Sequence, residues 1–134
     1  MNICAQNFIS LIESKNVKYS KYELEDGIVF VDFPYNGKTA HCIFSGDNGT
    51  YLSLYLAYED VPDEKLADVI FLCNELNAKY KWATFFVNDK KEFVLHDDAI
   101  LAPATAADET FELLLRILSI ADDVKAPLMK AIYA

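Results

Sequence analysis

The chain has 134 residues, of which 53% are hydrophobic and 25% are charged, a composition that fits one globular domain spanning residues 1–134 and excludes a disordered chain. With 12 Lys and Arg residues against 21 Asp and Glu residues, the net charge is −9, which disfavours both nucleic acid and an anionic membrane surface as partners. The sequence has no signal-peptide pattern and no apolar run long enough to span a membrane, so we expect a cytoplasmic protein.

The first half of the chain predicts a helix followed by an antiparallel meander. Apolar residues recur at helical spacing over residues 3–15, and Asn16 is suited to end this helix in the left-handed conformation, with Val17 packing against Ile12. Glycine-containing turns then separate runs of strand-forming residues. These predicted strands are Ile28–Tyr35, Thr39–Phe44 and Tyr51–Tyr58, with Tyr19–Leu24 as a candidate edge strand.

The second half predicts a helix, two strands and a final helix. The first of these helices follows Pro62, and its predicted buried stripe is Leu66, Val69, Ile70, Cys73, Leu76 and Tyr80. The strands are expected at about Trp82–Asn88 and Glu92–Ile100. The last helix starts near Thr105, which has capping-box spacing to Asp108, and we expect it to break near Asp122 before a short terminal helix with Pro127 in its first turn.

This order, α-β-β-β(-β)-α-β-β-α, predicts an α+β fold in which helices pack on an antiparallel sheet. The alternation along Tyr51–Tyr58 places leucines on the core face and Tyr51 and Tyr55 on the opposite face, which is amphipathic rather than charged. We therefore expect this second face of the sheet to be covered in part.

The last helix is apolar around nearly its whole circumference, which is typical of a helix buried on all sides. We interpret this apolar surplus as a homodimer interface or a partner-binding surface formed by the helix and the aromatic sheet face. The alternative is that the helix folds back over the sheet within one chain. The residues predicted for the surface are Tyr51, Tyr55, Leu113, Ile117, Ile120 and Val124.

Residues that could carry chemistry are few. The isolated cysteines Cys4, Cys42 and Cys73 are expected to be buried free thiols, and no hydrolase, nucleotide-binding or metalloprotease motif occurs. On a strand, His96 and Asp98 share a face, but no third metal ligand lies at a supporting spacing. We therefore predict no catalytic residue, no cofactor and no metal, and we read Asn74 and Asn77 as helix-ending residues or donors to the adjoining strand.

Several features together resemble the YbjN domain family of bacterial proteins. They are the opening helix ending at Asn16-Val17, the meander from Asp26-Gly27, the segment Val61-Pro62-Asp63-Glu64, the helix end Cys73-Asn74-Glu75-Leu76-Asn77, the hairpin of Phe85–Val87 and Phe93–Leu95, and the Leu-rich last helix. The resemblance implies a fold similar to that of type III secretion chaperones, and a small, acidic, non-enzymatic protein that often dimerises. It carries over no catalytic residue, and the family's label, sensory transduction regulator, names no chemistry.

Two functional hypotheses follow. The first is a chaperone-like protein-interaction module, homodimeric, that binds a polypeptide partner through an apolar surface. The alternative is a sensory or regulatory domain that binds a small ligand in a pocket lined by aromatic residues, which an internal cavity near Trp82 would favour over an exposed groove.

Overall fold

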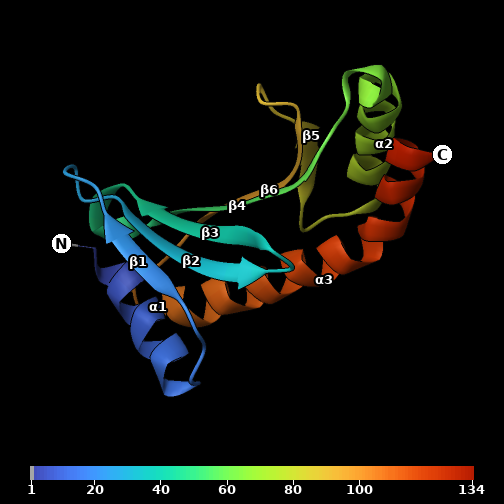
Figure 1. The fold of residues 1–134 in the computed structure, drawn as a ribbon. Helices are drawn as coiled ribbons and strands as arrows, with labels where there is room; N and C mark the ends of the chain where they lie inside the picture. Colours follow the sequence, from blue (N-terminus) through green and yellow to red (C-terminus); the bar gives the residue numbers. More distant parts are fainter. Residues whose placement is uncertain (1) are drawn as a thin grey trace.

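The computed structural model describes residues 2–134, which form an α+β fold with three α-helices and one six-stranded antiparallel sheet (Figure 1). Two single-turn 3-10 helices, η1 and η2, lie in the connections. In chain order the elements are α1 (Ile3–Ser14), β1 (Ser20–Glu23), β2 (Val29–Tyr35), β3 (Lys38–Ser45), η1 (Asp47–Gly49), β4 (Tyr51–Asp60), η2 (Asp63–Lys65), α2 (Leu66–Lys79), β5 (Thr84–Val87), β6 (Glu92–Ile100) and α3 (Ala106–Tyr133).

Both ends of α1 are fixed by hydrogen bonds. At the start, Asn2 Oδ1 accepts from the Ala5 amide at 3.0 Å, while Asn2 Nδ2 donates to the Phe44 carbonyl of β3 at 2.9 Å. At the end, Asn16 has a φ of 58°, and the Val17 amide donates to the Ile12 carbonyl at 3.0 Å. This is the predicted left-handed stop, which satisfies the last free carbonyls of the helix.

The strand order in the sheet is β1-β2-β3-β4-β6-β5, with every neighbouring pair antiparallel. The first four strands form the predicted meander, and the predicted edge strand is β1. The last hairpin then joins the sheet through β6, which pairs with β4 and leaves β5 as the far edge.

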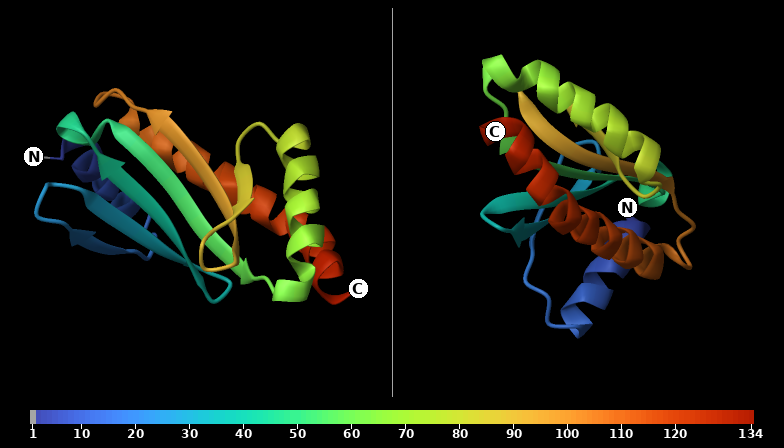
Figure 2. Two further views of the ribbon diagram at one scale, coloured as in Figure 1. Left: turned by 90° about the horizontal axis from the view of Figure 1, so that it is seen from above. Right: turned by 90° about the vertical axis from the view of Figure 1, so that its right-hand side faces the viewer.

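Helices α1 and α3 lie on one side of this sheet, α2 stands at its end beside β5, and the core lies between the helices and the sheet (Figures 1 and 2). Alternate strand residues point into the core, including Val31 of β2, Cys42 of β3 and Leu54 of β4, each at most 1% exposed. Phe8 of α1 packs between them, with its ring centroid 5.6 Å from that of Phe44. The aliphatic and aromatic residues that the sequence places at alternate strand positions therefore have one common function, which is to fill this single core.

The last helix differs from its prediction, because α3 is continuous from Ala106 to Tyr133 and contains Pro127 within it. A proline in a helix interior costs about 3 kcal/mol. Val124, Leu128 and Ile132 on both sides of it are at most 3% exposed, and burying each such side chain stabilises by about 1.5–3 kcal/mol. Their burial outweighs the cost of the proline, so the break expected near Asp122 does not occur. Figure 1 shows α3 turning toward α2 over its C-terminal part.

Three smaller expectations are also corrected. Ile70 of α2 is 55% exposed, because the buried stripe consists of Val69, Cys73 and Leu76 one helical turn apart. Thr105 caps α3 by position, but its hydroxyl bonds the Glu109 carboxylate and no capping box forms with Asp108. The last helix is also not buried all round, since Leu115 is 52% exposed on its outer side.

Candidate functional site

The face of the sheet that points away from the helices has no helix over it; we call it the open face. Seen from above, the strands lie in front of α3 with nothing in front of them in residues 2–134 (Figure 2, left). The sequence predicted that this face is partly covered, and within residues 2–134 no helix covers it, because α1 and α3 pack on the other face and α2 stands beside β5.

Six aromatic side chains cross the open face in one continuous row, one from each strand. We call them the aromatic row: Tyr22 of β1, Phe30 of β2, His41 of β3, Tyr55 of β4, His96 of β6 and Phe86 of β5. Consecutive ring centroids are 4.9, 5.9, 6.4, 6.5 and 6.1 Å apart, and the first pair is stacked. These spacings lie in the range in which aromatic pairs attract each other, so the row forms one packed surface.

The row covers a small apolar centre of its own. Val94 of β6 points to the open face, yet it is 0% exposed. Tyr55 and Phe86 come from the strands on either side of β6, and their ring centroids are 6.4 Å apart. The Tyr55 hydroxyl also accepts a hydrogen bond from Asn88 Nδ2 at 2.9 Å, which links β4 to the β5–β6 turn. These contacts hold the tyrosine ring in place on the surface.

Each histidine of the row is paired with an aspartate on the same face. His41 Nδ1 lies 2.8 Å from Asp32 Oδ1, and His96 Nε2 lies 3.1 Å from Asp98 Oδ1. The Asp98 side chain is 61% exposed, whereas that of Asp32 is 14% exposed. These aspartates are the charged groups at the centre of the open face, and the strand positions that point to it, read from the pairing register, include no Lys or Arg.

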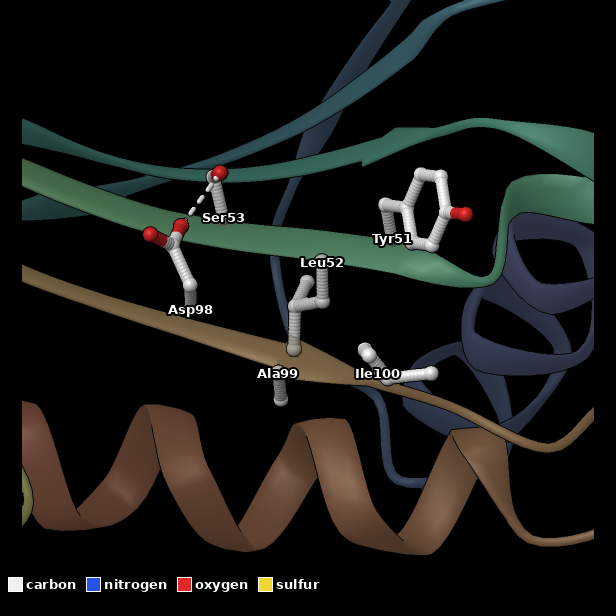
Figure 3. Close-up of a pocket in the computed structure, with 6 residues that line it drawn as sticks. All are labelled: Tyr51, Leu52, Ser53, Asp98, Ala99 and Ile100. Atoms are coloured by element: carbon white, nitrogen blue, oxygen red, sulfur yellow. Dashed lines mark hydrogen bonds between the residues drawn. The ribbon is translucent and has the colours of Figure 1, made fainter.

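A shallow hollow lies at the end of the open face, between β4 and β6 (Figure 3). It has a volume of about 430 Å³ and is lined by Tyr51, Leu52, Ser53, Asp98, Ala99 and Ile100. Tyr51 is 56% exposed and Ile100 is 81% exposed, which makes one side of the hollow apolar. On the other side the Ser53 hydroxyl donates to Asp98 Oδ1 at 2.7 Å. Figure 3 shows the tyrosine ring and the Ser53–Asp98 pair above the strands, with Leu52 pointing toward α3.

The structure separates the six residues that the sequence predicted for a partner surface. Tyr51 and Tyr55 lie on the open face, as the strand alternation indicated. Ile117, Ile120 and Val124 are 2%, 8% and 0% exposed, and Leu113 is half-buried. The three buried residues pack within the chain, so the alternative in which the helix folds back is correct for them and their assignment to an exposed surface is wrong, whereas Leu113 stays partly exposed and lines the hollow beside Trp82.

The edge strand β5 is closed by a side chain. Asn77 Nδ2 donates to the Phe85 carbonyl at 3.0 Å, and Asn77 Oδ1 accepts from the Phe85 amide at 2.7 Å. The amide group of Asn77 therefore takes the place that a further strand would occupy at this edge. The sequence predicted for Asn74 and Asn77 either the end of the helix or a hydrogen bond to the adjoining strand, and Asn77 makes that hydrogen bond.

The remaining reactive groups lie outside the open face. Cys4, Cys42 and Cys73 are free thiols at most 5% exposed, and burial raises the pKa of Cys73 to about 11. Within residues 2–134 no group of three or more His, Cys, Asp or Glu side chains is placed to hold a metal ion. The part of the chain that the structure describes also has no helix with both the length and the apolarity needed to cross a membrane.

Asp97 is the one aspartate of β6 that points to the helix side of the sheet. Desolvation raises its pKa, while a hydrogen bond from the Asp98 amide to its Oδ1, 3.0 Å long, acts in the opposite direction. It lines a second hollow with Trp82, Glu109 and Glu112. Trp82 itself lies under the Arg116 guanidinium, 5.1 Å from the ring centroid, in a junction between β5 and α3.

Fold and site together define a small α+β domain with a one-sided sheet and an exposed aromatic face. The family model of YbjN, described as "Putative bacterial sensory transduction regulator", matches residues 9–126, and the chain belongs to this family. The comparison with curated proteins gives no match.

Sequence reasoning placed Tyr51 and Tyr55 on the open face but did not predict that aromatic side chains from all six strands form one row. The sequence contains part of this information, because Phe30, His41 and His96 alternate along their strands with core residues and so point to the open face. What joins them into one row is the pairing of β4 with β6, which brings Tyr55 next to His96. That pairing joins segments about 40 residues apart, and no local pattern encodes it.

Proposed function

We propose that this protein is a non-enzymatic protein-interaction module that binds a polypeptide partner on the open face of its sheet. The observation that carries the proposal is the aromatic row, which crosses all six strands and has no helix over it. Soluble monomers rarely expose a contiguous apolar face of this kind unless it takes part in binding. Aromatic residues are also the side chains most enriched where proteins bind one another.

The family supports a regulatory rather than a catalytic role. Its description is that of a bacterial regulator of sensory transduction, and regulation commonly acts through binding to another protein. The resemblance to secretion chaperones adds the expectation of an extended polypeptide segment as the bound form. An extended segment fits the shape of the open face, since it can lie across the strands and contact several rings at once.

Affinity capture from the native cell tests the proposal with a matched pair of exposed tyrosines. Tyr51 lies on the open face and is 56% exposed, whereas Tyr133 lies at the end of α3 and is 77% exposed. Tyr51→Ala is expected to reduce the captured amount of a recurring protein partner by at least about tenfold, because tyrosine is among the side chains that contribute most to binding at interfaces. Tyr133→Ala is expected to leave it unchanged. Equal capture by both variants, or no recurring partner, contradicts the proposal.

The predicted homodimer is a separate proposal. The burial of Ile117, Ile120 and Val124 removes these residues of α3 from any dimer interface, so a dimer would have to use other surfaces, such as the open face or an edge of the sheet. Light scattering at micromolar concentration measures it directly, and a mass of one protomer contradicts it.

The alternative of a small-ligand domain has weaker support. The hollow beside Tyr51 opens to the surface, and Trp82 lies in the junction with α3, away from the aromatic row. The exposed groove therefore favours a polypeptide, by the criterion that the sequence analysis set for the two hypotheses.

A further inference from the structure

We propose that the open face selects a cationic segment, and that the hollow beside Tyr51 binds the side chain of an arginine or lysine of the partner. This inference rests on the proposed function, and it adds the chemistry of the partner. It follows from the charge distribution over the open face and from the geometry of the hollow.

The charge of the open face has one sign. The strand positions that point to it contribute Asp32, Asp98 and, near the β5–β6 turn, Glu92, and no Lys or Arg. Beside the hollow, the β1–β2 and β3–β4 loops bring Asp26 and Asp47 together around a common depression. With a net charge of −9 on the whole chain, the long-range field also attracts cations. A segment carrying Lys or Arg is therefore the electrostatic complement of this face.

The hollow has the parts that a long cationic side chain requires. Such a side chain combines an apolar stem with a charged head, and the two are bound best by different surfaces. The Tyr51 ring and Ile100 offer the apolar wall, and Asp98 offers the carboxylate across from them (Figure 3). A guanidinium can also lie on the face of an exposed tyrosine ring, which attracts cations.

The Asp98 carboxylate is held in position and keeps an acceptor for a ligand. Ser53 donates to Oδ1 at 2.7 Å, and His96 Nε2 lies 3.1 Å from the same atom. Within residues 2–134, Oδ2 makes no hydrogen bond. An arginine that reaches the hollow can therefore bond Oδ2 without displacing either neighbour.

Charge also argues against a second copy of this chain as the occupant. Two open faces brought together would place the aspartates of one protomer against those of the other, with no Lys or Arg at the strand positions that point to this face to compensate. Like charges placed opposite each other across an interface are costly. A basic partner avoids this cost.

Fluorescence anisotropy with three short labelled peptides tests the proposal. In the first, arginine alternates with leucine; in the second, glutamine replaces each arginine; in the third, glutamate does. We expect the arginine peptide to bind at least about tenfold more tightly than the glutamine peptide, with the glutamate peptide weakest. Asp98→Asn is expected to weaken the arginine peptide by about three- to fivefold, as for a partly exposed ion pair. Asp97→Asn removes the same charge from the helix side and is expected to leave binding within about twofold.

The outcomes separate this proposal from the proposed function. If the arginine and glutamine peptides bind equally and Tyr51→Ala weakens both, the face binds polypeptides but does not select cations, and this proposal alone fails. If Asp97→Asn weakens the arginine peptide as much as Asp98→Asn does, the hollow is not the site. If no peptide binds and the solution mass is that of two protomers, reduced to one by Tyr51→Ala, a second copy occupies the face and the proposal is overturned.

Discussion

The closure of the β5 edge by Asn77 gives a prediction whose size follows from two hydrogen bonds. Asn77→Ala removes both bonds to the Phe85 backbone, which are 3.0 and 2.7 Å long. A hydrogen bond of this kind contributes about 0.5–1.5 kcal/mol net, so the loss amounts to about 1–3 kcal/mol. Alanine also has a higher helix propensity than asparagine, which stabilises the variant by up to about 0.7 kcal/mol and offsets part of this loss.

Asn74→Ala is the matched control, since it removes the same side chain from the same helix one turn earlier. Asn74 is exposed, and within residues 2–134 its side chain makes no hydrogen bond. Asn74→Ala therefore gains the same helix propensity as Asn77→Ala but loses no hydrogen bond. The difference between the two variants isolates the edge bonds, and we expect Asn77→Ala to be less stable than Asn74→Ala by about 1–3 kcal/mol.

Urea unfolding measures this difference, and melting provides a check. With an unfolding entropy of about 2.1 cal/mol/K per residue, each kcal/mol shifts the Tm of a 134-residue chain by about 3–4 °C. Hydrogen exchange of the Phe85 amide is expected to accelerate in Asn77→Ala only. Asn77→Asp keeps the acceptor and loses the donor, so its stability should be intermediate. If Asn77→Ala and Asn74→Ala unfold within about 0.5 kcal/mol of each other, the side chain does not act as an edge partner.

Three further predictions concern the core and its borders. Gly49→Ala would place a Cβ 1.8 Å from Asn2 Oδ1, whereas a Cβ on Gly37 meets nothing within 4 Å. In urea unfolding, Gly37→Ala should therefore lose only the positive-φ strain of about 1–2 kcal/mol, and Gly49→Ala should lose clearly more. Equal losses of stability would contradict the contact between Gly49 and Asn2. Burial raises the pKa of Asp97, so the folded state holds its proton to higher pH than the unfolded chain and loses stability as pH rises through that window. Asp97→Asn should therefore be more stable than the parent at neutral pH and equal to it at about pH 3, and a difference that persists at the lower pH would refute this. Cys42 is fully buried and desolvation raises its pKa, so mass spectrometry should find it alkylated only in urea, and rapid labelling of the native protein would contradict its burial.

Local signals predicted the elements well. Asn16 and Val17 marked the end of α1, because an asparagine followed by an apolar residue suits a left-handed stop and its packing contact. Gly27 and Gly37 marked the turns of the meander, and both have the positive φ that those turns require. Such features depend on a few neighbouring residues, so one sequence is enough to find them.

Signals that depend on tertiary contacts were missed or misread. Pro127 predicted a helix break, but the burial of Leu128 and Ile132 against the rest of the chain overrides it. The apolar circumference of α3 predicted a partner surface, yet most of that apolar area is needed to cover the sheet from one side. The uncovered area lies on the sheet itself, because α1 and α3 pack on its other face and α2 stands beside β5.

The two edge strands of the sheet, β1 and β5, differ in whether a strand of another chain can pair with them. Sheets that grow by strand addition need two free edges, one for each neighbour, if copies are to add without limit. Here the β5 edge is occupied by Asn77, and the other edge is the four-residue strand β1. Pairing of β1 with β1 of another copy would leave, within residues 2–134, the β5 edge of each chain, where Asn77 holds the Phe85 backbone, so extension beyond two chains into a fibre would be disfavoured.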